Sequence, residues 1–197
     1  MTLSNSTTVG ETGTQTVVRT LTAERATAEA LAAFGALIGG PPDESARLSN
    51  FYDQAVMVQK SPFQSALPVE ISVCTIEPRA LRVRWMERHF QHTQAFLPLG
   101  GKPFVMVLAP PTEDDLPDPD AVRAFLFDGS AGFLLHIGVW HEFPFAVEPN
   151  TQVAVLLTKE ATQGLSRDNM VGTEGYSADL EKKDMAIRLG MEWEVRA

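Results

Sequence analysis

The sequence predicts a mainly β protein, a barrel or sandwich, with an N-terminal helix and a short C-terminal helical tail. Three observations carry this prediction. Short β-type runs follow one another from residue 68 to residue 159, each bounded by Pro, Gly, Asp or Asn. No helical pattern separates them, which favours a sandwich or barrel over alternating helices and strands. The chain is 44% hydrophobic over 197 residues, enough to bury one core but short for two.

The N-terminal part divides into a polar lead and a helix. Residues 1–16 are rich in Ser, Thr and Gly and lack the apolar and basic regions of a targeting segment, so we expect a disordered lead. Residues 22–38, TAERATAEALAAFGALI, combine strong helix formers with Leu31, Phe34, Leu37 and Ile38 at spacings of three and four. This spacing predicts an amphipathic helix.

The β-type runs form the middle of the chain. They are PVEISVCTI, ALRVRWMER, TQAFLPL, KPFVMVLAP, AVRAFLF, GFLLHIGVWH and TQVAVLLTK. The interruption PPTEDDLPDPD is acidic and proline-rich, so we expect a surface loop and not a domain boundary. The predicted domain spans residues 17–160. Residues 161–197 form a C-terminal extension in which SADLEKKDMAIRLGMEWEV is helix-like.

Composition limits the partners. The 25 acidic and 16 basic residues give a formal charge of -9, which repels phosphate backbones and anionic membrane surfaces, so we expect neither nucleic acid nor membrane as a partner. The longest apolar stretch is far shorter than the roughly 20 residues that span a bilayer. The single Cys74 lies in an apolar run and has no internal disulfide partner, which favours a buried thiol and a cytoplasmic protein.

The segment ERHFQHTQ concentrates groups able to do chemistry. In an unbroken strand through ALRVRWMERH, Glu87 and His89 share one face with Leu81, Val83 and Trp85. Both would then point into the mouth of the barrel. Arg88 takes the opposite parity, so it faces the pocket only if a bulge intervenes.

Four residues resemble the ligand order of cupin barrels. Glu87 and His89 come first, Gln94 follows where a glutamate is usual, and His141 arrives after the turn GVWH. Neutral imidazole and carboxylate or amide oxygen are ligands for a divalent transition metal, although two histidines and one acid are a sparse set. The four residues therefore form a candidate metal site or a candidate proton-transfer site, and the sequence leaves both open.

Simpler interpretations exist for several of these residues. Gln94 can hydrogen-bond a loop backbone, and a lone histidine such as His136 is more often a core or interface residue. His92, in the turn FQHT, is expected to face solvent. Trp85 and Trp140 are expected in the core, because large aromatic side chains mainly supply buried area.

Two longer segments resemble the ureidoglycolate lyase family, formerly called ureidoglycolate hydrolases. They are ERHFQHTQAFLPLGGKPFVMVLAP and VRAFLFDGSAGFLLHIGVWHEFPFAV. Members of that family carry ERH-x3-TQAF, PF, RAF and WH elements in this order, and the match covers roughly residues 17 to 158. The sequence departs from the family at His92, Leu134, Leu135 and Glu142, where the family usually has a small residue, a polar pair and a second histidine. These departures bear on the substrate more than on the fold.

The resemblance implies a cupin-like β-barrel, often a homodimer, that splits ureidoglycolate into glyoxylate and urea during allantoin and purine breakdown. The matching positions are Glu87, Arg88, His89, Gln94, Lys102, Arg123, His136, Trp140 and His141. Among them, we expect Arg88, Gln94, Lys102, Arg123, His136 and Trp140 to bind the substrate.

The elimination needs a base for the hydroxyl proton and an acid for the departing nitrogen, and no redox cofactor. His89 and His141 can take either role, with Glu87 or Glu142 as partner. Arg123, in AVRAFLF, is the expected cation for the substrate carboxylate, unless it points to solvent; Lys102 follows a Gly-Gly turn. A bound divalent metal can instead act as a Lewis acid. The alternatives are a paralogous lyase or hydrolase on a related small acid, and a non-catalytic module that binds a small acid.

Overall fold

The computed structural model describes residues 5–9, 15–40, 52–165 and 170–197. Strands dominate these residues and the helices are single turns or little more, so the predicted mainly β class is confirmed. The helical elements are α1 (Ala28–Leu31), η2 (Tyr52–Gln54), α2 (Lys159–Gly164) and α3 (Met185–Arg188). Among the described residues, no helix is long and apolar enough to cross a membrane.

The strands form three sheets, and every predicted β-type run contains at least one of their strands. The five-stranded sheet has the order β4 (Gly35–Gly39), β11 (Ala131–Leu135), β8 (Gln94–Leu99), β14 (Thr151–Thr158), β5 (Val69–Ile76). The nine-stranded sheet runs β15 (Met170–Val171), β16 (Glu174–Tyr176), β17 (Leu180–Asp184), β7 (Trp85–His89), β12 (Trp140–His141), β9 (Phe104–Ala109), β10 (Arg123–Phe127), β3 (Glu24–Arg25), with β13 (Phe145–Ala146) also paired to β9. The four-stranded sheet has the order β1 (Asn5–Val9), β2 (Gln15–Thr22), β18 (Met191–Arg196), β6 (Arg82–Val83).

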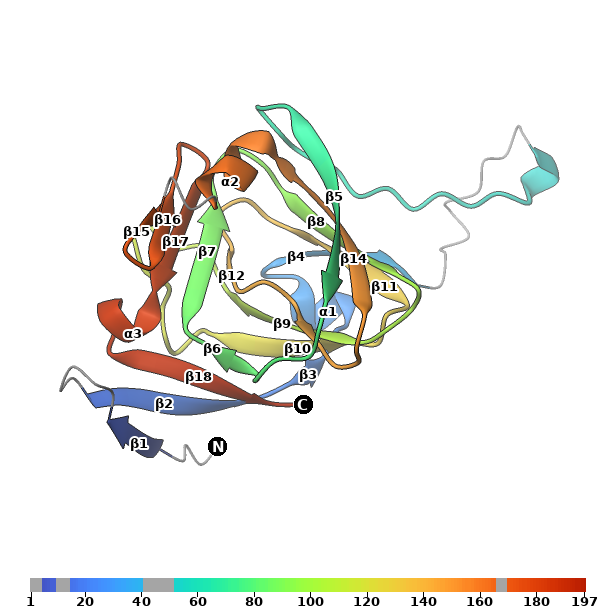
Figure 1. Cartoon of the computed structure of the whole chain (residues 1–197). Helices are drawn as coiled ribbons and strands as arrows, with labels where there is room; N and C mark the ends of the chain where they lie inside the picture. The colour runs from blue at the N-terminus through green and yellow to red at the C-terminus, as the bar shows by residue number, and fades with distance from the viewer. Residues whose placement is uncertain (1–4, 10–14, 41–51, 166–169) are drawn as a thin grey trace.

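The five-stranded sheet and the part of the nine-stranded sheet from β7 to β10 face each other around one interior, seen end-on in Figure 1. Each of the three sheets is open. Of the two predicted architectures, barrel and sandwich, the structure is therefore a sandwich. β9 alternates between two cores: Phe104, Met106 and Leu108 pack in the interior, while Val105 and Val107 pack in a second cluster with Trp193 of β18. β9 is therefore buried on both faces, between the interior and the second cluster.

The predicted N-terminal helix is wrong for most of residues 22–38. Only the four residues of α1 are helical, with Thr27 as N-cap, and the flanking residues form β3 and β4. Gly35 lies so close to β11 that a Cβ atom there would be 2.0 Å from the Leu134 carbonyl oxygen. Pairing of β4 with β11 along its whole length outweighs the helical preference of the local sequence.

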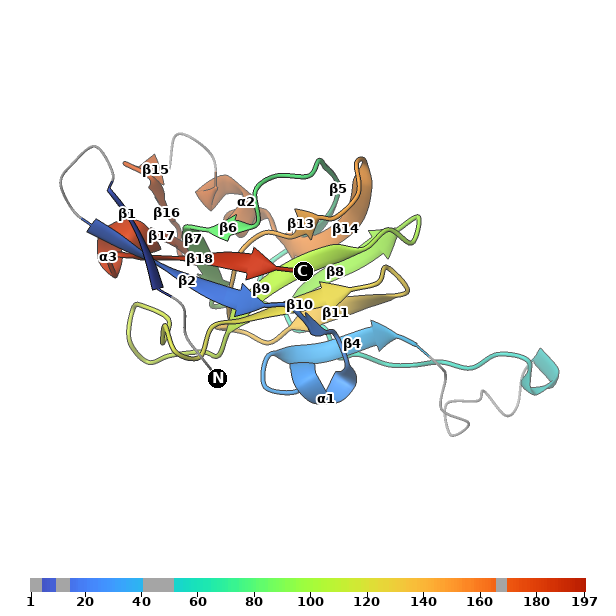
Figure 2. The same ribbon diagram turned by 90° about the horizontal axis from the view of Figure 1, so that it is seen from below.

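The predicted C-terminal helical tail is also wrong, apart from α3. β17 pairs antiparallel with β7 over its whole length, and β18 pairs in parallel with β2. Figure 2 shows β18 between β6 and β2, so the C-terminal extension is part of the sheet structure. Both strands pair with sheet edges that the preceding chain leaves free. A local sequence pattern cannot predict such a pairing, because the edge belongs to a distant segment.

Two other expectations concern loops and ends. Within the predicted disordered lead, Asn5–Val9 form β1 and pair with β2; residues 1–4 and 10–14 lie outside the described residues. The acidic segment 110–120 contains no helix or strand and is largely exposed, as predicted. It still has a structural role, because the Thr112 hydroxyl accepts a hydrogen bond from Trp140 Nε1 at 2.9 Å.

Candidate active site

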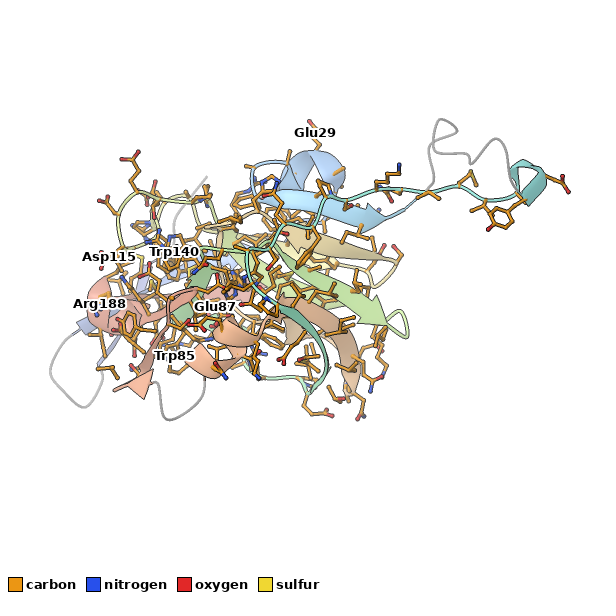
Figure 3. All side chains as sticks on the ribbon, turned by 90° about the horizontal axis from the view of Figure 1, so that it is seen from above. Glu29, Trp85, Glu87, Asp115, Trp140 and Arg188 are labelled. Carbon is orange, nitrogen blue, oxygen red and sulfur yellow. The ribbon has the colours of Figure 1, made fainter. Side chains whose placement is uncertain are left out.

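Glu87, His89 and His141 converge in the interior. Each offers a nitrogen or oxygen atom within 4.8 Å of the others, and all three side chains are buried. β7 and β12 place Glu87 directly opposite His141, with Glu87 Oε1 3.4 Å from His141 Nε2. The rings of His89 and His141 lie 5.3 Å apart. Figure 3 shows Glu87 inside the body of the molecule, whereas Glu29 projects outward from α1.

The strand that carries Glu87 and His89 is broken, contrary to the unbroken run expected. β6 ends at Val83 and joins the four-stranded sheet, while β7 begins at Trp85 in the nine-stranded sheet. Val83 and Met86 both pack in the second cluster, with Val105, Val107 and Trp193, which we call the outer cluster. Three positions separate the two residues, so the alternation of inward and outward side chains shifts by one residue between them. Glu87 and His89 therefore face the interior, opposite to Val83 and not beside it.

A tight turn sets the position of His141. Gly138 has a φ of 80° and donates its backbone N–H to the His89 carbonyl oxygen at 2.8 Å, which joins the start of this turn to the end of β7. A side chain at such a φ is strained, so glycine suits this turn. Trp140 then packs in the outer cluster and His141 faces inward.

Lys182 is a site residue that the sequence interpretation missed. Its Nζ lies 2.9 Å from Glu87 Oε2, and β17 holds Lys182 directly opposite Glu87. The side chain also lines an outer hollow of about 310 Å³ together with Trp85, Leu165 and Thr173. The sequence predicted a helix here, and no local signal connected Lys182 to a residue 95 positions earlier.

His92 is buried, and the prediction that it faces solvent is wrong. Only 1% of it is exposed, and its Nδ1 lies 2.8 Å from Asp179 Oδ2. Its ring is 4.6 Å from that of His89. Asp179 precedes β17 and accepts the backbone N–H groups of Phe90 and Gln91, which draws the whole turn inward. The deciding partner comes from a distant segment that the turn sequence does not reveal.

Several buried polar atoms around this centre have no hydrogen-bond partner. They are both ring nitrogens of His89, His92 Nε2, Gln94 Oε1 and His141 Nε2. Burying a polar atom without a partner costs free energy, so a group of such atoms marks a place where a ligand or water is held. Gln94 was expected at the site, and it faces the interior from the first position of β8.

The electrostatics separate the charged from the neutral groups. Burial opposes ionisation of Glu87, but Lys182 and the neighbouring His141 outweigh it, and the pKa of Glu87 lies far below its usual range. Burial, followed by the repulsion from His141, lowers the pKa of His89 to about 3. Burial also opposes the charge on Lys182, yet Glu87 outweighs it and the pKa of Lys182 is raised. At neutral pH the centre thus contains a carboxylate–ammonium pair beside a neutral imidazole.

Glu142 lies next to His141 but has different contacts. Its carboxylate accepts the Phe143 N–H at 3.0 Å and lies 3.5 Å from Arg79. Burial raises its pKa. The side chain lines a hollow of about 510 Å³ whose walls include Arg79, Arg84 and Trp85. Glu142 is therefore not one of the three converging groups. Trp85, in the wall of the same hollow, is only half-buried, so its predicted place in the core is wrong.

Other expected substrate-binding residues lie elsewhere. Arg123 forms a half-exposed ion pair with Glu24, with 2.6 Å between Nη2 and Oε2. Of the two positions that the sequence left open for Arg123, the structure shows the one that points to solvent. Lys102 Nζ donates to the Pro149 carbonyl oxygen at 2.6 Å in the turn after β8, and His136 is exposed. None of these three side chains contacts the converging groups in the described structure.

Arg88 and Trp140 face away from the interior. The Arg88 guanidinium lies 4.4 Å above the Trp140 ring and pairs with Glu181 at 2.5 Å. Both are buried, and Trp140 is in the core as expected. Their position on the opposite faces of β7 and β12 follows from strand alternation, since Glu87 and His141 occupy the inner positions.

The donor set suits a divalent metal. Glu87 has one oxygen toward Lys182 and the other toward His141, while both nitrogens of His89 are without a partner. A carboxylate and two imidazoles are a common partial set, which metals bind at about 2.0–2.2 Å. Tetrahedral bonds of this length put neighbouring ligand atoms about 3.4 Å apart, so the three side chains, which lie within 4.8 Å of one another, would close inward around an ion. The residues present therefore fit this group.

Comparison with known proteins identifies a family resemblance over most of the chain. Residues 18–176 match the family described as ureidoglycolate lyase. The ureidoglycolate lyase of Pseudomonas aeruginosa (strain LESB58) is 35% identical over 144 residues, which cover 71% of this chain and 83% of that protein. The ureidoglycolate lyase of Azotobacter vinelandii is 38% identical over 105 residues, 53% of this chain and 62% of that one.

Among solved structures, RmlC from Streptococcus suis in complex with dTDP-D-xylose gives a TM-score of 0.29 at 14% identity. The alignment covers 47% of this chain and 43% of RmlC. This likeness is too weak to bear on the chemistry of the present chain.

Proposed function

Because the chain belongs to the ureidoglycolate lyase family, we propose that it is an enzyme that cleaves ureidoglycolate to glyoxylate and urea. The observation that carries the proposal is the convergence of Glu87, His89 and His141 within 4.8 Å in a buried centre. Two segments about fifty positions apart supply these groups, and both belong to the matched residues.

The reaction needs two proton transfers. A base takes the proton of the substrate hydroxyl, the carbon–oxygen double bond of glyoxylate forms, and the carbon–nitrogen bond breaks with its electron pair passing to nitrogen. An acid then protonates that nitrogen and urea leaves. We assign the base to His89, whose ring is neutral and whose nitrogens have no partner.

His141 suits the role of the acid. Its Nδ1 lies 3.1 Å from the Val139 carbonyl oxygen, while its Nε2 has no hydrogen-bond partner and lies 3.4 Å from Glu87 Oε1. In the acid role, His141 passes a proton from Nε2 to the departing nitrogen, and Glu87 lies beside that ring nitrogen. Glu87 thus faces His141 through Oε1 and Lys182 through Oε2.

We assign the binding of the substrate carboxylate, which the sequence indicated for Arg123, to Lys182. The substrate carries a carboxylate, and a buried anion requires a cation. Lys182 is the ammonium in contact with the converging groups, and it extends from Glu87 to the outer hollow. We infer that it receives the substrate carboxylate at this boundary.

A divalent metal is the second version of the same site. Glu87, His89 and His141 would hold the ion with Gln94 as the predicted fourth donor, and a Lewis acid there would polarise an oxygen of the substrate. Exhaustive dialysis of the purified protein against a chelator, followed by elemental analysis and assay, separates the two versions. Activity that survives in metal-free protein supports the two-histidine version, and activity restored only by added metal supports the other.

The test of the function is the product pair. Purified protein incubated with ureidoglycolate should release glyoxylate and urea in equal amounts. Ammonia and carbon dioxide in place of urea would identify an amidohydrolase, and the absence of any product, with and without divalent metals, would overturn the assignment. His136→Ala is a matched control, because His136 is an exposed histidine of the same chain.

A related substrate remains a second candidate. His92 is buried beside His89 where the family usually has a small residue, so the surroundings of the site differ from the family pattern. Glu142, next to His141 in the chain, stands where the family usually has a second histidine. Turnover of other hemiaminal acids at a higher kcat/KM than ureidoglycolate would favour this candidate. A non-catalytic binding module would bind these acids without any turnover.

We also propose a homodimer that works in the cytoplasm, in allantoin and purine breakdown. The outer side of β5 supports self-association, because Val69, Ile71 and Val73 are 38%, 70% and 60% exposed on an edge strand. Apolar edge strands are natural sites of pairing between chains. Sedimentation of the wild type and of Ile71→Lys measures the state, and a wild-type monomer at micromolar concentration would exclude the dimer.

A further inference from the structure

The buried pair His92 and Asp179 has no part in the proton transfers described above. His92 Nδ1 lies 2.8 Å from Asp179 Oδ2, and the His92 side chain is 0% exposed. The other ring nitrogen, Nε2, is buried and has no hydrogen-bond partner. A histidine that served packing alone would not need a free nitrogen turned into a buried polar centre.

Asp179 fixes which nitrogen of His92 carries the proton. Its Oδ1 accepts the backbone N–H groups of Phe90 at 3.2 Å and Gln91 at 2.7 Å, and its Oδ2 accepts from the Thr158 hydroxyl and from His92. A carboxylate with four donors acts only as an acceptor. The proton of the neutral His92 ring therefore lies on Nδ1, and Nε2 offers a lone pair.

The free nitrogen belongs to the same centre as the reacting groups. The rings of His141, His89 and His92 follow one another at 5.3 and 4.6 Å. Gln94, two residues after His92, contributes Oε1, another buried acceptor without a partner. His92 Nε2 and Gln94 Oε1 are thus two buried acceptors without a partner, and a ligand that brings N–H donors would satisfy them.

Of the groups in ureidoglycolate, the ureido group presents N–H donors. Resting on the proposed function, we propose that His92, positioned by Asp179, accepts a hydrogen bond from the ureido end of the substrate at Nε2, with Gln94 Oε1 as the second acceptor. Asp179 lies beyond residues 18–176, so a segment outside the family match sets this contact. His92 is then a specificity residue and Asp179 a positioning residue.

The first test compares two stable ligands on the full chain. Oxalurate carries a carboxylate and a ureido group, and oxamate is the same molecule without the terminal carbamoyl group. Wild-type protein should bind oxalurate more tightly than oxamate. In His92→Phe, we expect oxalurate to bind about tenfold more weakly, the typical effect of one lost hydrogen bond, and oxamate to bind within about twofold.

The second test reads the proton position directly. Long-range ¹H–¹⁵N NMR should show His92 protonated on Nδ1 in the wild type. In Asp179→Asn an amide N–H can replace the accepting oxygen, which favours a proton on Nε2 and should weaken oxalurate binding although His92 is intact. Thr158→Val is the control: it removes another partner of Asp179 Oδ2, and should leave both the tautomer and the preference for oxalurate unchanged.

Equal binding of oxalurate and oxamate to the wild type, or an unchanged preference in His92→Phe, would overturn the inference even in an active lyase. A preference that disappears in Thr158→Val as it does in Asp179→Asn would also overturn it, since general loosening would then explain both. Absence of lyase activity with an intact preference for oxalurate would reject the proposed function and keep the ureido contact.

Discussion

The interior has two halves that are equally buried and differ in how their atoms are satisfied. In the phenylalanine half, Phe104 and Phe127 stack at 4.8 Å and Phe127 meets Phe133 at 5.7 Å. In the histidine half, formed by Glu87, His89, His92, Gln94 and His141, five buried nitrogen or oxygen atoms have no hydrogen-bond partner. β8 joins the halves, because Gln94 and Phe96 occupy inner positions of one strand.

The difference indicates that the two halves do different work. Close-packed aromatic rings supply the hydrophobic free energy that holds the sheets together. Buried polar atoms without partners subtract from stability, and a protein keeps such a group where a ligand repays the cost. Substitutions in the two halves should therefore have opposite effects on stability and activity.

The largest expected effect is on the rate in the histidine half. His89→Ala and His141→Ala should each lower kcat/KM by about 10²- to 10⁴-fold, the usual contribution of positioned proton transfer. Thermal unfolding should change little, since few hydrogen bonds are lost. Glyoxylate release and calorimetry measure the two quantities, with the exposed His136→Ala as the control. A collapse of stability in His89→Ala would mean that the histidine half is structural.

The phenylalanine half should show the reverse. Phe125 is completely buried and meets Phe34 edge to face at 5.4 Å. Phe125→Ala should lower the free energy of unfolding by about 3–5 kcal/mol through lost burial and a cavity. The kcat per folded molecule should stay within about twofold of the wild type. Urea titration followed by assay below the transition tests both, and a large loss of kcat would show that the halves are coupled.

The pH dependence of stability should also arise in the histidine half. The His89 pKa is about 3 in the folded state and near 6.5 in the unfolded chain, so only the unfolded state binds a proton between these values. The contribution of the neutral His89 ring to the free energy of unfolding is fully present above pH 6.5. It is lost as the pH falls toward 3, because protonation then favours the unfolded chain. The slope reaches about 1.4 kcal/mol per pH unit for one proton.

Metal-free His89→Leu should lose this slope, and urea titrations between pH 4 and pH 7 measure it. Phe125→Ala should shift the whole curve downward and keep the slope. Parallel pH profiles of wild type and His89→Leu would show that His89 does not titrate as its burial requires.

The smallest effect is expected at Arg123. It forms a half-exposed ion pair with Glu24, so Arg123→Ala should cost at most about 1 kcal/mol of stability. KM for ureidoglycolate should stay within about twofold, whereas Lys182→Met should raise it about tenfold or more, because charged hydrogen bonds contribute about 1.5–3 kcal/mol. Initial-rate kinetics on both variants decide which cation receives the carboxylate. A higher KM in Arg123→Ala alone would restore the assignment made from sequence.

The sequence by itself determined the strands of the middle of the chain, the acidic surface loop, and the convergence of Glu87, His89 and His141. These features depend on neighbouring residues, since alternation and turn residues act over a few positions. The family motifs lie in the same segments and so were visible in the same way.

Only the tertiary structure decided which long-range partners complete the site. Lys182 reaches Glu87 and Asp179 reaches His92 because β17 pairs with the free edge of β7, although local propensity favoured a helix there. The change of parity before β7 and the inward turn of His92 depend on the same packing. Pairing between strands about 90 positions apart depends on how the whole chain folds, so it cannot be predicted from the residues next to each strand.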